Sequence, residues 1–324
     1  MSEHFVPDEL VEYRLAVAGM APGDSDHDRL LRLVAAEQIS ADEAVMRTCS
    51  AGGVRIDEEA DFAIEDWDDY LIPGTPTLRS KLIDLHSGLG VSDPDRFFAL
   101  EQDIGRIRII ELAIDPVVGS FDFAHLKSIH SRIFQDIFPW AGRTRIGPQT
   151  PVIRFAPDAI AFDPGDPAAP MEKYSYYTGP EVEEAASVMF AQIVHVMSRT
   201  DLPRQTIVDI SVEYGAELQT IHPFRDGNAR AFWIFTLQSY ERLGFPLDPR
   251  QFVTGSAARA RAIHGVHRYQ STASHDTLVT LFDEVIASDK TPAKKSPTET
   301  SAAPRKLNPP RPDRGRPLTG ERGL

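Results

Sequence analysis

The sequence contains a single cysteine, Cys49, among its 324 residues. One thiol cannot form a disulfide within the chain, and it cannot supply the set of cysteine ligands that a structural zinc site needs. Disulfide scaffolds and cysteine zinc sites are therefore excluded. The scarcity of cysteine fits a protein of a reducing compartment, and we expect the cytoplasm.

Long apolar runs, a leader sequence and an excess of positive charge are also missing. No apolar run approaches the roughly 18 residues of a membrane-spanning helix, so we expect no membrane segment. The first residues lack the basic and apolar regions of a signal peptide, so we expect none. A formal net charge of −14 argues against direct nucleic-acid binding through a broad basic surface. Any phosphate that the protein binds must be held by a local group of residues.

What is present is a soluble globular composition, with 42% hydrophobic and 25% charged residues. We divide the chain into a small helical segment at residues 1–55, an acidic linker at 56–69, a helical domain at 70–288 and a tail at 289–324. The tail holds seven prolines and nine Lys or Arg against four Asp or Glu, so we expect it to be disordered. The rest of the chain then carries a charge of about −19.

The periodicity of the apolar residues predicts a mainly helical protein. The clearest amphipathic stretch is 93–112, and Asp122 is placed to cap a helix over 120–138. The remaining expected helices span 8–18, 26–37, a segment after Ser40, 77–88, 181–198, 205–220, 231–243, 256–264 and 277–288. Between them, 143–146 and 152–155 flank a Gly-Pro turn and predict a small β-hairpin, whereas 156–180 is predicted to be a loop.

One short stretch between two predicted helices combines a histidine, a carboxylate and two arginines. Pro223 and Gly227 interrupt the helical pattern, so the stretch is a loop that opens a helix. The free N–H groups at such a helix start suit phosphate. The histidine is a candidate base, the carboxylate a candidate Mg²⁺ ligand and an arginine a candidate phosphate clamp. The stretch reads Ile221-His222-Pro223-Phe224-Arg225-Asp226-Gly227-Asn228-Ala229-Arg230.

Other histidines carry a weaker signal. His264, His267 and His275 lack a carboxylate at ligand spacing, so we interpret them as ordinary helix or loop residues and not as a metal site. His125 and His130 lie on a predicted core helix, where most histidines are packing residues. The sequence has no Walker-type phosphate loop and no nucleophile elbow.

The loop motif resembles that of the Fic (Fido) family of nucleotide-dependent protein-modifying enzymes, His-x-Phe-x-Asp/Glu-Gly-Asn-Gly-Arg-x-x-Arg. The similarity extends from about Tyr70 to Ser288 and includes the helix around His125 and His130 and the Trp140-Ala141-Gly142 turn. The resemblance implies an all-α fold, a Fic-type helical core with a small β-hairpin flap beside the active site. It also implies the reaction, which is transfer of AMP from ATP to a hydroxyl group of a target protein.

The resemblance assigns a role to each motif residue. His222 would be the catalytic base, which requires a neutral imidazole. Asp226 would bind Mg²⁺. Gly227, Asn228 and Ala229 would form an anion hole, and Arg230 would bind phosphate. The flap, roughly 143–154, would dock the target as an added strand through Thr144, Arg145, Ile146, Ile153 and Arg154.

The sequence departs from the family motif at two positions. Ala229 replaces a glycine, which would allow phosphate to approach the backbone closely and permit a positive φ. Trp233 replaces the second arginine, which in the family orients the terminal phosphate, so a charge-assisted contact of about 1.5–3 kcal/mol is lost. These changes leave three alternatives open: the nucleotide is held differently, the activity is weak, or the donor is not ATP.

The N-terminal segment resembles the small antitoxin module that accompanies many Fic toxins, here fused to the enzyme. Residues 12–14 resemble its first helix and 35–44 its last. The inhibitory Ser/Thr-x-x-x-Glu-Gly/Asn motif of that module is not intact. If Ala18-Gly19 aligns with Glu-Gly, an alanine replaces the glutamate. The resemblance implies either a small antitoxin partner or an intramolecular N-terminal cap.

We therefore expect a nucleotidyltransferase that uses ATP and Mg²⁺ to modify a Ser, Thr or Tyr hydroxyl of a protein target, as a toxin or effector. One alternative keeps the fold but transfers phosphate or another phosphate-linked group, and another is a catalytically weak binding module that docks partners through its flap. The basic tail resembles, in composition, the secretion signals of effectors exported by conjugation-type machines.

Overall fold

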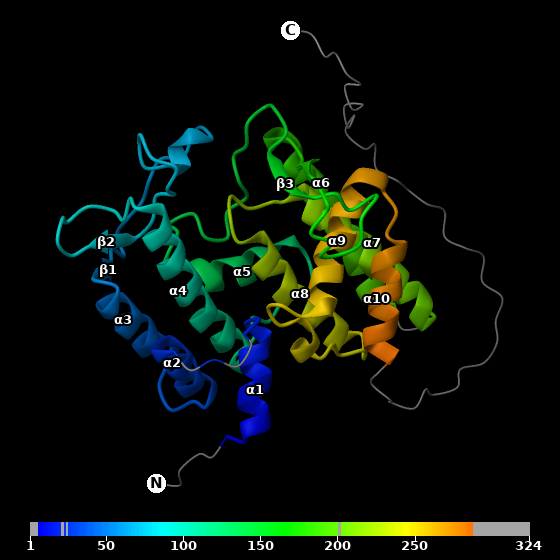
Figure 1. Ribbon diagram of the computed structural model, residues 1–324, viewed down its shortest axis with the longest axis horizontal. Coiled ribbons are helices and arrows are strands. Elements are labelled where there is room, and N and C mark those ends of the chain that lie inside the picture. Colours follow the sequence, from blue (N-terminus) through cyan, green and yellow to red (C-terminus); the bar gives the residue numbers. More distant parts are fainter. Residues whose placement is uncertain (1–5, 21–22, 24, 200–201, 288–324) are drawn as a thin grey trace.

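The computed structural model describes residues 6–20, 23, 25–199 and 202–287 of the chain. The predicted disorder of the tail at 289–324 lies outside these residues. Within them the chain is mostly helical, as expected (Figure 1). The helices are α1 (Asp8–Val17), α2 (Asp26–Ala35), α3 (Ala41–Ala51), α4 (Pro94–Ile114), α5 (Phe123–Phe134), α6 (Val182–Met197), α7 (Arg204–Ile221), α8 (Asn228–Arg242), α9 (Ala257–Thr272) and α10 (Asp276–Ala287). The strands are β1 (Val54–Ile56), β2 (Leu82–Asp84), β3 (Ile153–Pro157) and β4 (Met171–Ser175), and short 3-10 turns are η1 (Asp68–Tyr70), η2 (Gly179–Glu181) and η3 (Pro249–Phe252).

Side-chain caps determine where several helices begin. Asp93, Asp122 and Ser40 each accept a hydrogen bond from the backbone N–H three residues further on, at the starts of α4, α5 and α3. Such caps satisfy N–H groups that would otherwise lack a partner. The cap predicted at Asp122 is therefore confirmed. Apart from the one expected at 77–88, the expected helices form with shifted ends, and α9 continues well past its predicted end at His264.

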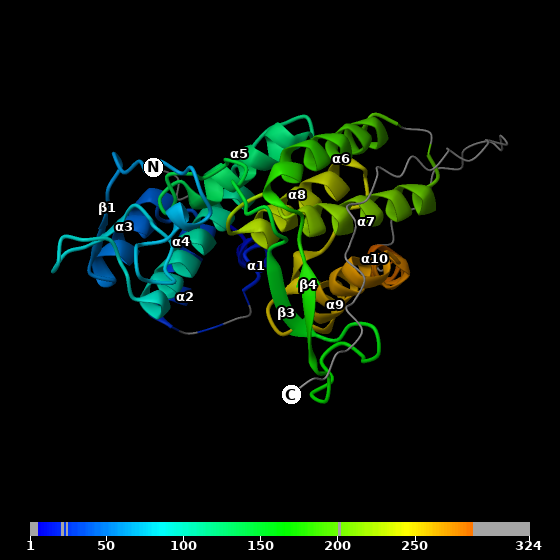
Figure 2. The same ribbon diagram turned by 90° about the horizontal axis from the view of Figure 1, so that it is seen from above.

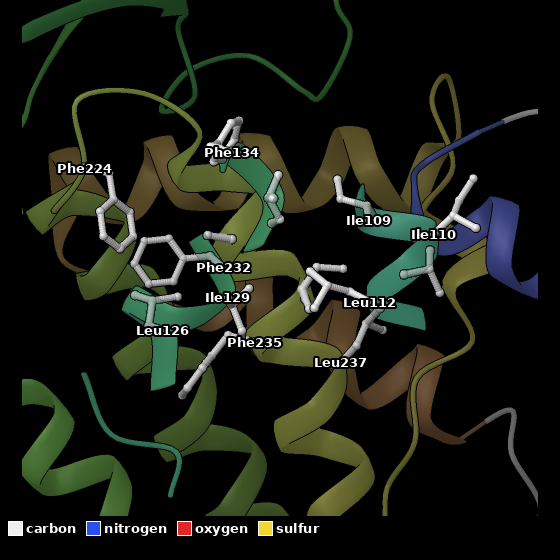
Figure 3. Close-up of a cluster of buried hydrophobic side chains, with 14 of the residues drawn as sticks. Ile109, Ile110, Leu112, Leu126, Ile129, Phe134, Phe224, Phe232, Phe235 and Leu237 are labelled. Atoms are coloured by element: carbon white, nitrogen blue, oxygen red, sulfur yellow. The ribbon is translucent and has the colours of Figure 1, made fainter. Parts of the chain in front are cut away.

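Helices α4, α5 and α8 pack together at the centre of the molecule and form the base of the motif loop (Figure 3). Their contributions to this core include Ile110, Ile129 and Phe232, all almost completely buried. Phe224 of the loop is itself fully buried in the same core. Because a fully buried side chain of this size contributes roughly 1.5–3 kcal/mol, the loop is firmly anchored.

The remaining helices cover this centre on two sides. Helices α6, α7, α9 and α10 pack against one another beyond α8. Helices α1, α2 and α3 pack against α4, and α1 also contacts η3. Apolar residues of the N-terminal helices, such as Leu31 and Val45, belong to the same core as those of α8. None of the helices described here has the length and apolarity needed to cross a lipid bilayer.

One predicted helix is wrong. Residues 77–88 do not form a helix but contain β2, which pairs antiparallel with β1 in the register Val54↔Asp84. The Asp84 carboxylate accepts hydrogen bonds from the N–H groups of His86 and Ser87. An aspartate that bonds its own following backbone favours a turn over a helix. The helical spacing of apolar residues in this stretch was therefore misleading.

The predicted hairpin exists, but with a different partner strand. β3 pairs antiparallel with β4 in the register Ile153↔Ser175 and Pro157↔Met171, within the region predicted to be a loop. Residues 143–146 form no strand with it. They lie against the motif loop, and the Ile146 N–H donates to the Tyr70 hydroxyl at 3.0 Å. Figure 2 shows the β3–β4 hairpin beside α9.

Candidate functional site

His222 ends α7 in a backbone conformation that is uncommon for a residue other than glycine. Its φ of 54° and ψ of 64° are left-handed, and its N–H donates to the Leu218 carbonyl at 3.0 Å. Nε of the buried Arg145 donates to the His222 carbonyl at 2.7 Å, and Nη2 donates to the Tyr177 carbonyl at 2.6 Å. The Arg145 N–H donates to the Pro223 carbonyl at 2.8 Å. Arg145 therefore fixes the turn that presents His222.

The imidazole of His222 stacks on Tyr176, with ring centroids 4.0 Å apart and an interplanar angle of 23°. Burial, reinforced by the positive charge of Arg145, lowers the pKa of His222 to about 3. Its Nδ1 is buried and has no hydrogen-bond partner within the described part of the chain. His222 is consequently neutral near pH 7 and can accept a proton.

The loop after His222 is closed by two hydrogen bonds to one side chain. The Phe224 N–H donates to Asn228 Oδ1 at 2.9 Å, and Asn228 Nδ2 donates to the Phe224 carbonyl at 2.8 Å. His130 stacks on Phe224, accepts a hydrogen bond from the Gly142 N–H through Nδ1 and contacts the Asp226 carbonyl through Nε2, both at 2.9 Å. Because Nδ1 accepts, Nε2 carries the proton and donates. The amide of Asn228 thus shapes the loop and is not free for phosphate.

Helix α8 begins immediately after this loop, and no side chain caps its first turn. Gly227 precedes it with φ of 75°, and a Cβ there would lie 2.2 Å from the Phe134 ring. Only glycine meets both conditions. The N–H groups that open α8 therefore remain available to an anion, at the positive end of the helix dipole.

Asp226 is the carboxylate nearest to this helix start. Its Oδ1 accepts a hydrogen bond from the Gly227 N–H at 2.6 Å, and within the described residues it forms no ion pair. No group of three or more metal-ligating side chains exists in that part of the chain. Mg²⁺ needs only one or two carboxylates when phosphates and water supply its other ligands. The residues present therefore fit a Mg²⁺ shared with bound phosphate.

Arg230 lies on the first turn of α8 and is paired with Glu101 of α4 through Nη2. Burial raises the pKa of Glu101, whereas the charge of Arg230 lowers it, and the net direction is upward. The other terminal nitrogen, Nη1, is buried and lacks a partner among the described residues. It would lie 3.0 Å from a Cβ added at Gly105. Glu101 thus orients the guanidinium of Arg230, and Nη1 lies against α4 at Gly105.

A cavity of about 490 Å³ opens beside these residues. This size falls within the roughly 300–1,000 Å³ of typical ligand pockets. Its lining includes His222, Ala229 and Arg230 from the motif together with apolar side chains of α6, α7, α9 and α10. The candidate base and the candidate anion site therefore face the same cavity.

The two positions that depart from the motif lie on the same wall of this cavity. Ala229 lies within α8, and it is not among the described non-glycine residues with positive φ, so its methyl group causes no backbone strain. The indole Nε1–H of Trp233 donates to the Val17 carbonyl of α1 at 3.0 Å, and the ring packs against Phe252. Position 233 thus supplies an apolar wall and a contact with the N-terminal helix.

The five predicted flap residues separate into two groups. Ile153 and Arg154 lie on β3, where Ile153 is exposed and Arg154 lines the cavity. Thr144, Arg145 and Ile146 lie on the segment against the motif loop, where Thr144 donates to Glu183. Arg145 is only 3% exposed, so the prediction that its side chain docks a target is wrong. Its hydrogen bonds hold it inside the protein.

The acidic stretch before the helical domain contributes aromatic residues to the site. The Arg225 guanidinium lies 4.1 Å from the Trp67 ring centroid and 5.6 Å from that of Tyr70. Such cation–π contacts stabilise an arginine that is partly removed from water. Trp67 had no assigned role in the sequence, because only its place in an acidic run was visible there.

Three histidines outside the motif, His264, His267 and His275, contact neighbouring groups of the protein. His264 contacts the Phe162 carbonyl at 2.8 Å, His267 stacks on Tyr174, and His275 lies 3.1 Å from Asp209. None of them belongs to a cluster of three metal-ligating groups within the described residues. The interpretation of these side chains as ordinary helix or loop histidines agrees with their contacts.

Comparison with known proteins gives relatives of one kind. Residues 120–239 match the family described as "Fic/DOC family". "Protein adenylyltransferase VbhT" of Bartonella schoenbuchensis is 27% identical over 164 residues, which are 51% of this chain and 30% of that protein. The chain therefore spans less than a third of that relative. "Probable protein adenylyltransferase y4lH" of Sinorhizobium fredii is 28% identical over 59% of this chain and 86% of its own length.

Solved structures show the same fold. BepC of Bartonella tribocorum, described as a VirB-translocated effector with bound AMPPNP, superimposes with a TM-score of 0.51 at 19% identity. The match covers 68% of this chain and 98% of that one. At this identity the likeness concerns the fold, which is a mostly helical core with a small hairpin.

Proposed function

Because the chain belongs to the Fic/DOC family, we propose that it is a protein adenylyltransferase, which transfers AMP from ATP to a hydroxyl side chain of a target protein. The observation that carries the proposal is the neutral His222 beside the uncapped start of α8, both facing one cavity. A base and an anion site at one place are what nucleotidyl transfer to a hydroxyl needs. The curated relatives named as adenylyltransferases support the same activity.

In the proposed reaction, His222 removes the proton from the target hydroxyl as its oxygen attacks the α-phosphorus of ATP. A new P–O bond forms to the target, the bond to the β-phosphate oxygen breaks, and pyrophosphate leaves. Because burial disfavours the charged form, His222 is neutral before the reaction, and its ring carries a lone pair that can take the proton. Tyr176 stacks on the ring, and Arg145 holds the backbone carbonyl of His222.

The charge on the phosphates is met by groups of α8 and the preceding loop. The N–H groups at the start of the helix would donate to the phosphates, and Arg230, which lines the cavity, would supply positive charge beside them. Mg²⁺ bound by Asp226 and the phosphates would neutralise part of the developing charge. AMPPNP bound to BepC supports an adenine nucleotide as the ligand.

The target protein is proposed to dock along β3. The outer face of the hairpin exposes Ile153 at 41% and Phe155 at 64%, while Arg154 of the same strand lines the cavity near His222. An extended segment that pairs with a strand edge places alternate side chains in reach of such residues. A Ser, Thr or Tyr of that segment could then present its hydroxyl to His222.

The N-terminal segment at 1–55 is proposed to act as an intramolecular cap. Trp233 donates to the carbonyl of Val17, the last residue of α1, and Thr254 donates to the Gly19 carbonyl just after the helix, so hydrogen bonds to the backbone hold this end of α1 in place. Ala18, aligned with the inhibitory glutamate of antitoxins, has no carboxylate to offer.

Export is a further proposal, because BepC is described as VirB-translocated and the tail at 289–324 is basic and proline-rich.

A second candidate is transfer of a different phosphate-linked group. The observation that favours it is Trp233, which replaces a cation on the cavity wall with an indole. A donor with less terminal charge would suit that wall better than ATP.

Incubation with Mg²⁺ and ATP labelled separately at the α and γ phosphates distinguishes these reactions. An extract that contains candidate targets is incubated with the labelled ATP and with either the wild-type protein or the His222→Ala variant. We expect α-label on protein that depends on His222. γ-Label would support the second candidate, and no label on protein from either nucleotide would contradict the proposed activity.

A further inference from the structure

The cavity beside the motif has a strongly positive lining in a protein that is otherwise acidic. Four arginines line it, Arg106, Arg154, Arg230 and Arg259, and the lining assembled from the described residues contains no Asp or Glu. The whole chain has a formal net charge of −14. Such a local concentration of guanidinium groups in an acidic protein indicates a polyanionic ligand.

Arg259 occupies a distinct place in this lining. It lies on the first turn of α9, and its Nη1 would come within 2.7 Å of a Cβ added at Gly19, so the guanidinium lies against the end of α1. Val17, two residues before Gly19, accepts the Trp233 hydrogen bond. Arg259 therefore lies near the turn of α8 that follows Arg230, where the uncharged Trp233 stands.

The charge of Arg259 is not balanced by an acidic side chain of the described part of the chain. Within the described residues, its guanidinium forms no ion pair, and Arg106 has only Asp103 at 3.6 Å. Loss of water lowers the pKa of Arg259, and the positive charge of Arg106 lowers it further. Two guanidinium groups that repel each other favour an anion between them.

A structural role explains other cations of α9 but not this one. Arg261 is paired with Glu284 of α10 at 2.6 Å, and Arg268 donates to the carbonyls of Ala159 and Ile160. These two side chains tie α9 to neighbouring segments. The exposed Arg259 makes no such tie among the described residues and faces the cavity instead.

We infer that Arg259, assisted by Arg106, binds the terminal phosphate of the nucleotide in this cavity. This inference rests on the proposed function, since it takes ATP as the ligand. In this arrangement the helix start and Arg230 hold the inner phosphates, and the terminal phosphate lies beside Arg259, near Trp233. The cation absent from position 233 is thus supplied from α9.

Binding of ATP, ADP and AMP to the full chain tests this assignment, measured by calorimetry in the presence of Mg²⁺. The variant is Arg259→Gln, and the matched control is Arg261→Gln, an arginine of the same helix that lies outside the cavity. We expect Arg259→Gln to weaken ATP binding by about tenfold, as the loss of one charge-assisted contact does, and to leave AMP binding unchanged. Arg106→Gln should weaken ATP binding in the same direction by a smaller factor.

Equal weakening of ATP and AMP would overturn the inference, because it would indicate a general change of the cavity. Unchanged ATP affinity in Arg259→Gln, or absence of ATP binding by the wild type, would also overturn it. Binding and transfer can fail separately. If ATP binding depends on Arg259 but no labelling depends on His222, the adenylyltransferase activity is rejected and the phosphate contact is retained. If labelling depends on His222 but Arg259→Gln leaves the ATP affinity unchanged, the activity is retained and the phosphate contact is rejected.

Discussion

At the scale of single residues, the site depends on side chains that hold the motif as much as on the motif itself. His222 stands in a left-handed conformation, which costs about 1 kcal/mol or more unless neighbouring groups stabilise it. Arg145 supplies this stabilisation through the carbonyls of His222 and Tyr177. Glu101 forms an ion pair with Arg230 and so orients its guanidinium. The residues that position the reactive groups of the loop therefore come from distant parts of the chain.

Replacing Arg145 with Met tests the role of its hydrogen bonds to the His222 and Tyr177 carbonyls. The change leaves buried carbonyls without donors, so we expect a loss of about 2–4 kcal/mol in the free energy of unfolding and a fall in transfer rate. Arg143→Met removes a nearby exposed arginine and is the matched control. Urea unfolding and label transfer measure both effects. Equal behaviour of the two variants would show that these hydrogen bonds are unimportant.

The motif residues could be identified from the sequence, but their supports could not. His222, Asp226 and Arg230 are adjacent in the chain and carry recognisable chemistry. Arg145 is separated from His222 by 77 positions and Glu101 from Arg230 by 129. No local pattern relates residues so distant, because the fold alone brings them together.

At the scale of secondary-structure elements, most helices followed from apolar periodicity and capping residues, whereas of the four strands only β3 did. Both partners of the β1–β2 pair have only three residues, and they are separated by a long loop. β4 reads Met-Glu-Lys-Tyr-Ser, without the alternation of a half-buried strand. Pairing with β3 and packing of Tyr174 on His267 make it a strand. Such non-local contacts are absent from sequence periodicity.

The β3–β4 hairpin should govern access of the target. Phe155→Ser removes an apolar side chain that is 64% exposed on the outer face of β3. We expect modification of the protein target to fall several-fold, while ATP affinity stays the same, since Phe155 does not line the cavity. Ile160→Ser, in the loop beyond β3, is the control. A parallel fall in ATP affinity would contradict a docking role.

The contact between α1 and α8 has a defined energetic value. Trp233→Phe keeps the aromatic packing against Phe252 but removes the hydrogen bond to the Val17 carbonyl. We expect the free energy of unfolding to decrease by about 1 kcal/mol. Thermal unfolding of the variant measures this effect. A decrease of about 3–5 kcal/mol in the free energy of unfolding, as large as that caused by truncating a buried aromatic residue, would mean that α1 had detached from the protein.

At the scale of the whole molecule, stability should depend on buried neutral histidines. Burial lowers the pKa of His222 and His130 to about 3 and that of His267 to about 4, from an ordinary value of 6.5. Below pH 6.5 the unfolded chain therefore binds protons that the folded chain does not. The free energy of unfolding should fall as the pH decreases from about 6.5 towards 4.

Urea unfolding at about pH 7 and about pH 5 measures this dependence. His267→Gln removes one of the three groups, so its stability should decline less between the two conditions. His86→Gln, at an exposed position, is the control. A free energy of unfolding that is constant or rises as the pH falls would contradict the buried, neutral state of these side chains.

The chain as a whole is acidic, whereas the cavity formed by the described residues is lined by four arginines, and we propose that the nucleotide binds there. The formal charge of −14 gives no general attraction for anions, so binding must depend on the arginines and the start of α8. The N-terminal helices complete one wall of that cavity through Val17 and Gly19. The N-terminal segment therefore contributes directly to the cavity that contains the motif residues.

The central claim is that His222 directs transfer of AMP to a protein hydroxyl. Mass spectrometry of proteins incubated with Mg²⁺–ATP and the wild-type chain measures this most directly. We expect peptides heavier by one AMP group on a Ser, Thr or Tyr, present with the wild type and absent with His222→Ala. Equal AMP modification by both proteins, or phosphate in place of AMP, would contradict it.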